Sequence, residues 1–447
     1  MKKFVADLHL HSSYSRACSK ELNFPNLSKW AKYKGIDLLS TTDFTHPKWF
    51  AEIKNNLKED GSGLFNFVGS DSGQGTKFIL GTEVACIYSQ GGSLHRIHIL
   101  LFVPKLEDVS KINEKLANYG TLPSDGRPML GISAKNLALL IFEINKDAII
   151  IPAHVWTPWF SLYGSNSGFD SLEECFGETA KYIYAIETGL SSDPAMNWRI
   201  GDLDNKSIVS FSDAHSLPKM AREATVFEAP INYDGILKAL RSIQVADQSS
   251  SKPKIAFTIE FFPEEGKYHF SGHRNCGIKQ SDEETANRGT ICPVCKKKLT
   301  LGVIHRVNSL AKRETKELGT EIDKEGFVKS KFLLARPPFV NLVPLQEIIA
   351  ESLHISSLSE KVRQEYLNLV KHFGSELNVL LKVEISEIVK AVSVANIAAG
   401  VQKVRERDLI IEPGFDGVYG VVKIWPEGLQ KPKIEIQADG QIDLFDK

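Results

Sequence analysis

Histidine and carboxylate residues recur at short spacing near the start of the sequence. Asp7, His9 and His11 alternate with leucines, so an extended chain would carry all three on one face. Burying two imidazoles and a carboxylate together costs several kcal/mol unless these groups find partners, and a metal ion is the usual partner. The spacing therefore predicts a metal site, with a chance surface pair as the alternative.

Further residues of these types follow apolar runs along the first half of the chain. We expect a single site built from His9, His11, Asp43, Glu83, His98, His154, Glu187, Asp213 and His215, with His46 as a further candidate. This donor set suits zinc, manganese, magnesium or iron, and it exceeds what one ion binds, so we expect two or three divalent ions. Such sites hydrolyse phosphate esters, and the predicted catalytic residues are His9, His11, Glu83, Asp213 and His215.

These donors must be positioned by strands, because nearly every one stands at the end of a short apolar run. The runs cover residues 4–11, 36–43, 78–83, 97–103, 148–154, 184–187 and 208–215. Stretches with helical apolar spacing separate several of them, as at 27–34 and 134–143. This alternation predicts an α/β fold with a parallel sheet or barrel whose chemistry lies at the strand ends.

The opening D-x-H-x-H of residues 7–11 and the closing Ser212-Asp-Ala-His215 together resemble the polymerase and histidinol phosphatase (PHP) family. The resemblance covers residues 1 to about 245 and implies a distorted barrel of seven β/α units with a trinuclear metal site. It carries a ligand role onto His9, His11, Asp43, Glu83, His98, His154, Asp213 and His215. The sequence departs from the family's T-D-H motif at Phe44, which follows Asp43.

The polar stretch 247–254 predicts a boundary, so we expect a barrel over residues 1–250. A small zinc-finger module should follow over 251–310, then an α-rich domain over 311–430 and a flexible tail over 431–447. Helical spacing at 345–353, 362–373 and 385–399 supports the α-rich assignment.

Two short knuckles predict one structural zinc ion. His273-x2-Cys276 and Cys292-x2-Cys295 are separated by 15 residues, a spacing typical of a closed tetrahedral site. His269 is the alternative fourth ligand. A locally basic strip follows, and we expect Lys296, Lys297 and Arg306 to contact DNA phosphates.

Three features point beyond a small-molecule phosphatase and resemble the endonuclease Q family: residues 41–47, the aromatic loop 156–164, and the zinc module followed by Pro413–Gly420. The resemblance spans residues 1 to about 425. It implies a DNA repair enzyme that cuts 5′ to a deaminated base (hypoxanthine, uracil or xanthine) or an abasic site. Because such an enzyme extrudes the base it inspects, Trp156, Trp159 and Tyr419 are candidate DNA contacts.

The last residues carry a further motif. Gln441-Ile-Asp-Leu444-Phe445 resembles the peptide that binds the bacterial sliding clamp, and the clamp is therefore an expected partner through Gln441, Leu444 and Phe445. A short tether of this kind would raise the enzyme's effective concentration on DNA.

Composition limits the remaining alternatives. The 54 Lys and Arg residues nearly balance the 55 Asp and Glu residues, so any DNA-binding surface must be a local patch. No stretch reaches about 18 uncharged apolar residues, and we expect a cytoplasmic, nucleoid-associated protein. A phosphatase for a small phosphomonoester is one alternative, although it leaves residues 255–447 unexplained. The other alternative is a non-catalytic, clamp-associated DNA-binding protein whose metal site is vestigial. Metal analysis would identify this case, because such a protein should retain only the zinc ion of the finger.

Overall fold

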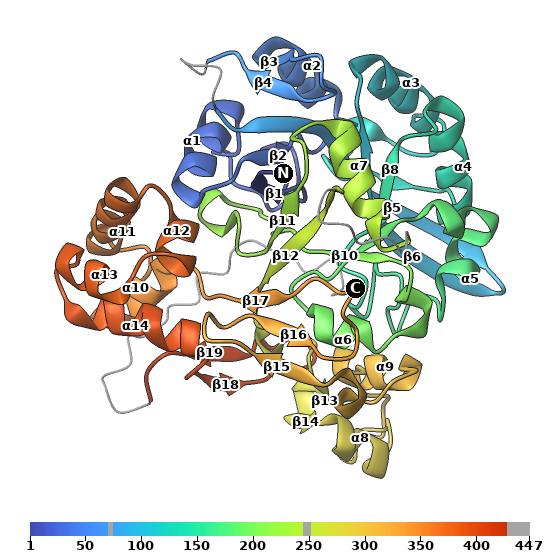
Figure 1. Ribbon diagram of the computed structural model, residues 1–447. Coiled ribbons are helices and arrows are strands. Elements are labelled where there is room, and N and C mark those ends of the chain that lie inside the picture. The colour runs from blue at the N-terminus through green and yellow to red at the C-terminus, as the bar shows by residue number, and fades with distance from the viewer. Residues whose placement is uncertain (70–74, 245–251, 427–447) are drawn as a thin grey trace.

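The computed structural model of the 447-residue chain describes residues 1–69, 75–244 and 252–426 (Figure 1). Within these ranges, no helix combines the length and apolar character that crossing a membrane requires. A barrel occupies the first half of the chain, and the zinc-finger module and a helical domain pack against it.

Seven strands enclose the barrel, each at a position expected from the apolar runs. They are β1 (Lys3–Asp7), β2 (Leu38–Ser40), β5 (Lys77–Gln90), β6 (Ser93–Val103), β8 (Ile149–Pro152), β9 (Ala185–Glu187) and β10 (Ser207–Val209). Ladders join β1 to β2, β2 to β5, β5 to β6, β6 to β8 and β9 to β10. Two contacts close the ring: Val155 N donates to Glu187 O at 3.1 Å, and Leu10 forms a parallel bridge with Ala214. The α/β barrel expected from the sequence is confirmed.

One strand departs from the expected parallel arrangement. Strand β6 runs antiparallel to both β5 and β8. The cause is the turn Gly91-Gly92, whose φ values of 58° and 80° suit a tight two-residue hairpin. The chain therefore reverses directly instead of crossing over through a helix.

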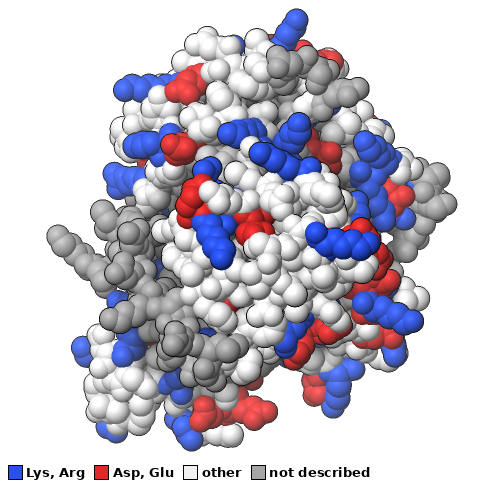
Figure 2. Space-filling model, turned by 90° about the vertical axis from the view of Figure 1, so that its left-hand side faces the viewer, with Lys and Arg blue, Asp and Glu red and all other residues white. Residues whose placement is uncertain are grey.

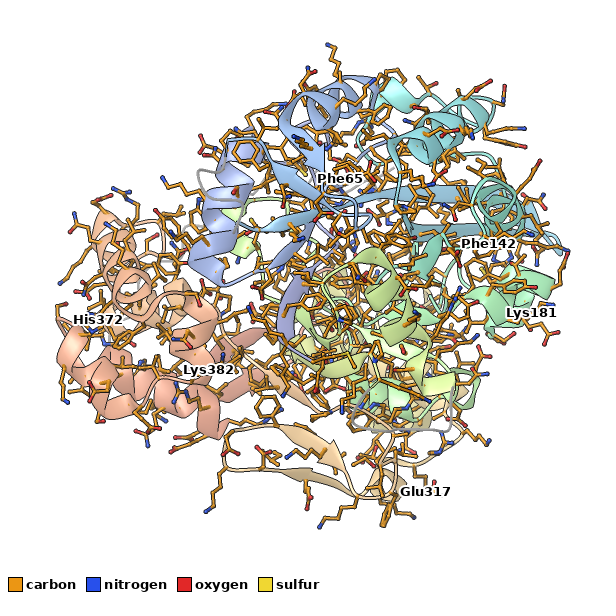
Figure 3. All side chains as sticks on the ribbon, turned by 45° about the horizontal axis from the view of Figure 1, so that its top comes forward. Phe65, Phe142, Lys181, Glu317, His372 and Lys382 are labelled. Atoms are coloured by element: carbon orange, nitrogen blue, oxygen red, sulfur yellow. The ribbon has the colours of Figure 1, made fainter. Side chains whose placement is uncertain are left out.

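Helices cover the outside of the barrel, and the two expected from periodicity are present. The helices of this half are α1 (Phe24–Lys34), α2 (Pro47–Asn56), α3 (Leu106–Leu116), α4 (Ala134–Ile144), α5 (Leu172–Phe176), α6 (Pro194–Trp198) and α7 (Tyr233–Arg241). The starts of α1 and α4 are fixed by Asn23 and Ser133, whose side chains accept backbone N–H groups of the first turn. Phe142 of α4 and Lys181 mark this outer surface in Figure 3. Short strands β3 (Leu57–Glu59), β4 (Phe65–Phe67) and β7 (Met129–Leu130) extend the sheet beside β5.

The main sheet continues past the polar stretch at residues 247–254. Strand β11 (Ala224–Glu228) pairs with β1 on one side and with β12 (Lys254–Glu260) on the other. Strand β12 also pairs in parallel with β17 (Phe339–Asn341), to which β16 (Val328–Ser330) and β15 (Thr320–Ile322) are added. The polar stretch therefore connects two neighbouring strands of one sheet.

The zinc-finger module is small, and its helix α9 lies against α6 of the barrel (Figure 1). It contains β13 (Ser271–His273), β14 (Ile278–Gln280), α8 (Asp282–Arg288) and α9 (Val303–Leu310). A capping box at Ser281 and Glu284 begins α8.

The helical domain consists of α10 (Leu345–Leu353), α11 (Glu360–Phe373), α12 (Glu376–Leu381), α13 (Ile385–Ala391) and α14 (Ala395–Glu406). The helical spacing over 385–399 covers two helices, separated by Val392-Ser393-Val394. Strands β18 (Ile410–Glu412) and β19 (Val421–Lys423) follow, and His372 and Lys382 lie at the surface of this domain (Figure 3). On the face formed by α1 and the helical domain, basic and acidic groups are interspersed (Figure 2).

The helical domain is attached to the barrel through a buried ion pair. Lys34 Nζ at the end of α1 lies 2.7 Å from Glu376 Oε2 of α12, and their side chains are 2% and 4% exposed. Tyr366 OH donates to the same oxygen at 2.8 Å, and Leu345 N donates to Glu376 Oε1 at 3.1 Å. Trp30 stacks on Tyr366, and one continuous apolar core includes residues of both parts.

Candidate metal centre

The chain following β1 positions the first two expected ligands. His9 and His11 are both 1% exposed, and the intervening Leu10 is buried in the apolar core. Asp7 accepts the backbone N–H groups of Ser212 at 3.0 Å and Ala221 at 2.9 Å. Asp7 therefore fastens the segment that carries Asp213 and His215 against β1.

Three overlapping groups of side chains place their donor atoms within 4.8 Å of one another: His9, His11 and Glu83; His11, Asp213 and His215; and Glu83, His98 and His154. Glu83 belongs to two groups and has an oxygen for each. Its Oε2 lies 3.4 Å from His9 Nε2 and 3.3 Å from His11 Nε2, whereas its Oε1 lies 2.7 Å from His98 Nδ1. All seven members of these groups were expected ligands. Glu83 and His98 lie in the middle of β5 and β6, and the other five follow the ends of β1, β8 and β10.

Two other expected ligands lie behind this cluster and orient the histidines. Glu187 Oε1 is 2.9 Å from His9 Nδ1, so His9 presents Nε2 to the centre. Asp43 Oδ1 is 3.3 Å from His11 Nδ1, and its Oδ2 accepts the Ser12 and Ser15 hydroxyls at 2.6 and 2.7 Å. Such carboxylate partners fix the orientation of a ligating imidazole. The geometry therefore favours orienting roles for Glu187 and Asp43.

His46 also lies outside the three groups. It caps the start of α2 by accepting Trp49 N, and it stacks on Tyr14 with ring centroids 4.6 Å apart.

The backbone at the centre is held in an uncommon conformation. Asp43, His154 and Asp213 have φ values of 42°, 30° and 45°, in the left-handed region that non-glycine residues seldom adopt. Each such residue costs of order 1–3 kcal/mol and persists only where the surroundings fix it. Their coincidence at three strand ends indicates a functional site.

The electrostatics fit bound cations. Burial alone would raise the pKa of Glu83, but the Arg127 guanidinium and the imidazoles that face its oxygens hold this pKa well below its ordinary value. Burial lowers the pKa of His98 to about 3, so this imidazole is neutral, as a metal ligand must be. Among the described residues, His9 Nε2 is buried without a hydrogen-bond partner, and it faces oxygens of Glu83 and Asp213. A divalent ion would satisfy this nitrogen, so the residues present fit metal binding.

The four residues expected to bind structural zinc also come together. His273, Cys276, Cys292 and Cys295 place their donor atoms within 4.8 Å of one another. His269 Nδ1 lies instead 3.1 Å from Pro263 O, which favours His273 as the fourth ligand. Burial opposes ionisation of Cys292, but the N–H groups of Cys295 and Val294 lower its pKa to about 6, which favours the thiolate that zinc binds.

Two of the expected DNA contacts form hydrogen bonds within the protein. Trp156 is 1% exposed, stacks on Tyr163 and donates to Asn197 Oδ1 at 2.8 Å. Arg306 donates to the backbone oxygens of Tyr163 at 3.0 Å and Phe169 at 3.1 Å. Both side chains stabilise the 156–170 segment, Trp156 from within the core and Arg306 with a side chain that is 18% exposed.

The other candidate DNA contacts remain accessible. Lys296 and Lys297 are exposed beside the zinc site. Tyr419 is 61% exposed beneath Lys267, whose Nζ lies 4.7 Å from the ring centroid. Trp159 is partly buried and meets Tyr268 edge-on at 5.8 Å. Gln441, Leu444 and Phe445 lie outside the described residues.

Sequence reasoning missed Arg127. Its Nη1 lies 3.2 Å from Glu83 Oε2, although the residue belongs to no apolar run and no spaced motif. The available signal was the turn Ser124-Asp-Gly-Arg-Pro128, which precedes β7.

Over nearly its whole length, the chain is similar to solved structures of known proteins. It is 33% identical to the lesion-specific endonuclease PfuEndoQ of Pyrococcus furiosus, with a TM-score of 0.78 over 97% of this chain and 98% of that one. A complex of endonuclease Q with a 27-mer duplex carrying an abasic lesion gives a TM-score of 0.79 at 33% identity, over 97% and 99% of the two chains.

Curated relatives match as well. The uncharacterised protein YqxK of Bacillus subtilis is 28% identical over 95% of this chain and 100% of its own length. The uncharacterised protein MJ0043 of Methanocaldococcus jannaschii is 27% identical over 75% of this chain, which spans 40% of that relative. Residues 344–408, which contain α10–α14, match the family described as the MJ0043 C-terminal domain.

Proposed function

The chain belongs to the endonuclease Q family, and on this premise we propose that it is a metal-dependent DNA endonuclease that incises at lesions. Its substrates are DNA strands carrying a deaminated base (hypoxanthine, uracil or xanthine) or an abasic site. Incision lies 5′ to the lesion and leaves 3′-hydroxyl and 5′-phosphate ends. The observation that carries the proposal is the buried convergence of His9, His11, Glu83, His98, His154, Asp213 and His215 in a member of this family.

The residues of the centre have different roles in phosphodiester hydrolysis. Divalent ions bound there supply activation of water at neutral pH and stabilisation of charge on the leaving oxygen. Glu83 spans two ligand groups with its two oxygens, and thereby sets their spacing. Asp213 and His215 are partly exposed, at 24% each, and line the side of the centre open to substrate. Glu187 and Asp43 hold His9 and His11 in the required orientation.

We assign DNA contacts to surfaces around this centre. Tyr419 offers an exposed ring with a cation over it, which suits stacking on a base, and Trp159 is the second aromatic candidate. Lys296 and Lys297 are accessible to phosphates beside the zinc site, whose single ion has a structural role. The units 1–250, 251–310 and 311–430 serve catalysis, zinc-dependent support and DNA or lesion recognition, in a cytoplasmic, nucleoid-associated enzyme.

The test of the catalytic proposal is incision of end-labelled oligonucleotides carrying one hypoxanthine, uracil or abasic site, with magnesium or manganese added. Asp213→Asn should abolish incision and retain binding of lesion DNA, because Asp213 Oδ1 lies 3.2 Å from His11 Nε2 within a ligand group. The matched control is Asp234→Asn on α7, whose side chain is 67% exposed and paired with Lys238. Normal incision by Asp213→Asn would remove this residue from the mechanism.

The tail proposal is tested separately. The motif that contains Gln441, Leu444 and Phe445 binds the bacterial sliding clamp. Replacing Leu444 and Phe445 by alanine should eliminate clamp pull-down while cutting of short oligonucleotides stays unchanged. Retained pull-down would reject the motif without affecting the nuclease proposal.

A further inference from the structure

Arg127 brings a positive charge to the centre of the ligand cluster. Its Nη1 lies 3.2 Å from Glu83 Oε2, the oxygen that also faces His9 Nε2 and His11 Nε2. Arg222, by comparison, donates to the backbone oxygens of Ser212 and Asp213 and therefore supports the chain rather than the ligand side chains.

The loop that carries Arg127 is rigidly built against the centre. A Cβ atom on Gly126 would lie 2.2 Å from Ser15 Oγ and 2.3 Å from Asp43 Oδ2, so only glycine allows this approach. Thr45 Oγ1 donates to Gly126 O at 3.1 Å, and Ala85 N of β5 donates to Pro128 O at 3.0 Å. The backbone on both sides of Arg127 is thus fixed to elements that carry or orient ligands.

The guanidinium retains unused donors. A guanidinium has five N–H groups, and among the described residues the one side-chain hydrogen bond of Arg127 goes to Glu83. The Arg127 side chain is 22% exposed, whereas that of Glu83 is 1% exposed. Arg127 is thus partly accessible, as are Asp213 and His215 of the same centre, at 24% each. A planar guanidinium fork matches two oxygens of a phosphate.

We propose that Arg127 is a catalytic residue that binds the non-bridging oxygens of the scissile phosphate, an inference that rests on the proposed function. In the reaction, the water oxygen bonds to phosphorus and the bond from phosphorus to the 3′ oxygen breaks. The water loses a proton and the departing 3′ oxygen gains one. Arginine stays protonated throughout, so Arg127 acts on the charge that accumulates on the phosphate oxygens and not by proton transfer.

The experiment compares Arg127→Ala and Arg127→Lys with the wild-type enzyme on DNA carrying one abasic site, with kcat and KM measured separately. Removing one donor to a developing oxyanion costs on the order of 10²–10³ in kcat, so we expect this loss for Arg127→Ala and a smaller one for Arg127→Lys. Bound metal per protein, measured by mass spectrometry, should stay at the wild-type level. Millimolar guanidinium should raise the kcat of Arg127→Ala at least tenfold and should leave the kcat of the other enzymes unchanged.

The matched control is Arg16→Ala. Arg16 is 62% exposed and lies 3.5 Å from Asp125 in the same loop region, so its loss should leave kcat within twofold of wild type. Wild-type kinetics of Arg127→Ala would overturn the assignment and leave the nuclease proposal intact. Loss of metal, with activity restored by added metal, would also overturn it, because Arg127 would then only position Glu83. Absence of cutting by the wild-type enzyme would instead defeat the proposed function itself.

Discussion

The buried pair between Lys34 and Glu376 gives a stability prediction that can be worked through from its geometry. Replacing Lys34 by methionine keeps most of the side-chain volume and removes the charge 2.7 Å from Glu376 Oε2. At an effective dielectric constant of about 20, the attraction lost is about 6 kcal/mol. Glu376 keeps two neutral donors, from Tyr366 and Leu345, which offset part of the loss. Breaking a buried pair in this way costs about 3–5 kcal/mol.

We therefore expect Lys34→Met to lower the free energy of unfolding by about 4 kcal/mol at pH 7. The assay is urea unfolding at pH 7, followed by tryptophan fluorescence.

Lys32→Met is the control, because Lys32 lies on the same helix and is exposed, so its effect should stay within about 0.5 kcal/mol. The double variant Lys34→Met, Glu376→Gln should recover most of the stability, because it leaves no unpaired charge. A loss below about 1 kcal/mol for Lys34→Met, or a double variant no better than the single one, would refute the reasoning.

Three further predictions concern the metal sites and the core. Glu187→Gln should weaken metal binding about 10–100-fold, because Glu187 orients His9, whereas the exposed Glu178→Gln should not, as measured by metal titration. Cys292→Ser should remove one zinc ion per chain and lower the melting temperature, and unchanged zinc content would contradict the finger assignment. Burial raises the pKa of Glu260 to about 8, so the folded state holds this proton more tightly than the unfolded state between about pH 4.5 and 8. Stability should therefore fall as pH rises through this range, and the melting temperature of Glu260→Gln should fall less between pH 5 and pH 8.

The cluster of candidate metal ligands could largely be predicted, because it follows from residue types and their spacing. His9 and His11 alternate with buried leucines, and Glu83 and His98 lie within long apolar runs that became β5 and β6. The period-two pattern determines which face a side chain occupies, and closure of the barrel brings the strand ends together. Neither step requires knowledge of the loops.

Features that depend on loop placement were not predictable. Arg127 reaches Glu83 only because Gly126 packs against Asp43, a contact between distant segments. Trp156 has a residue type suited to DNA contact, but tertiary packing buries its side chain in the core. Strand β6 is antiparallel to β5 because the Gly91-Gly92 turn reverses the chain. The sequence contains this local signal, but the alternation of strands and helices led to the prediction of a parallel arrangement.

The pairing of β11 with β12 has a consequence for the chain during synthesis. Until residue 254 and its successors leave the ribosome, β11 forms the open border of the barrel sheet, with its outward N–H and C=O groups unpaired. Strand β12 is then the unpaired edge strand until β17, some 80 residues further along the chain, has been synthesised and pairs with it. A polypeptide cut at the polar stretch between β11 and β12 would keep that open border permanently, and strand borders of this kind recruit other chains. The barrel therefore depends on the second half of the molecule to stay monodisperse, even though every metal ligand of its centre lies in the first half.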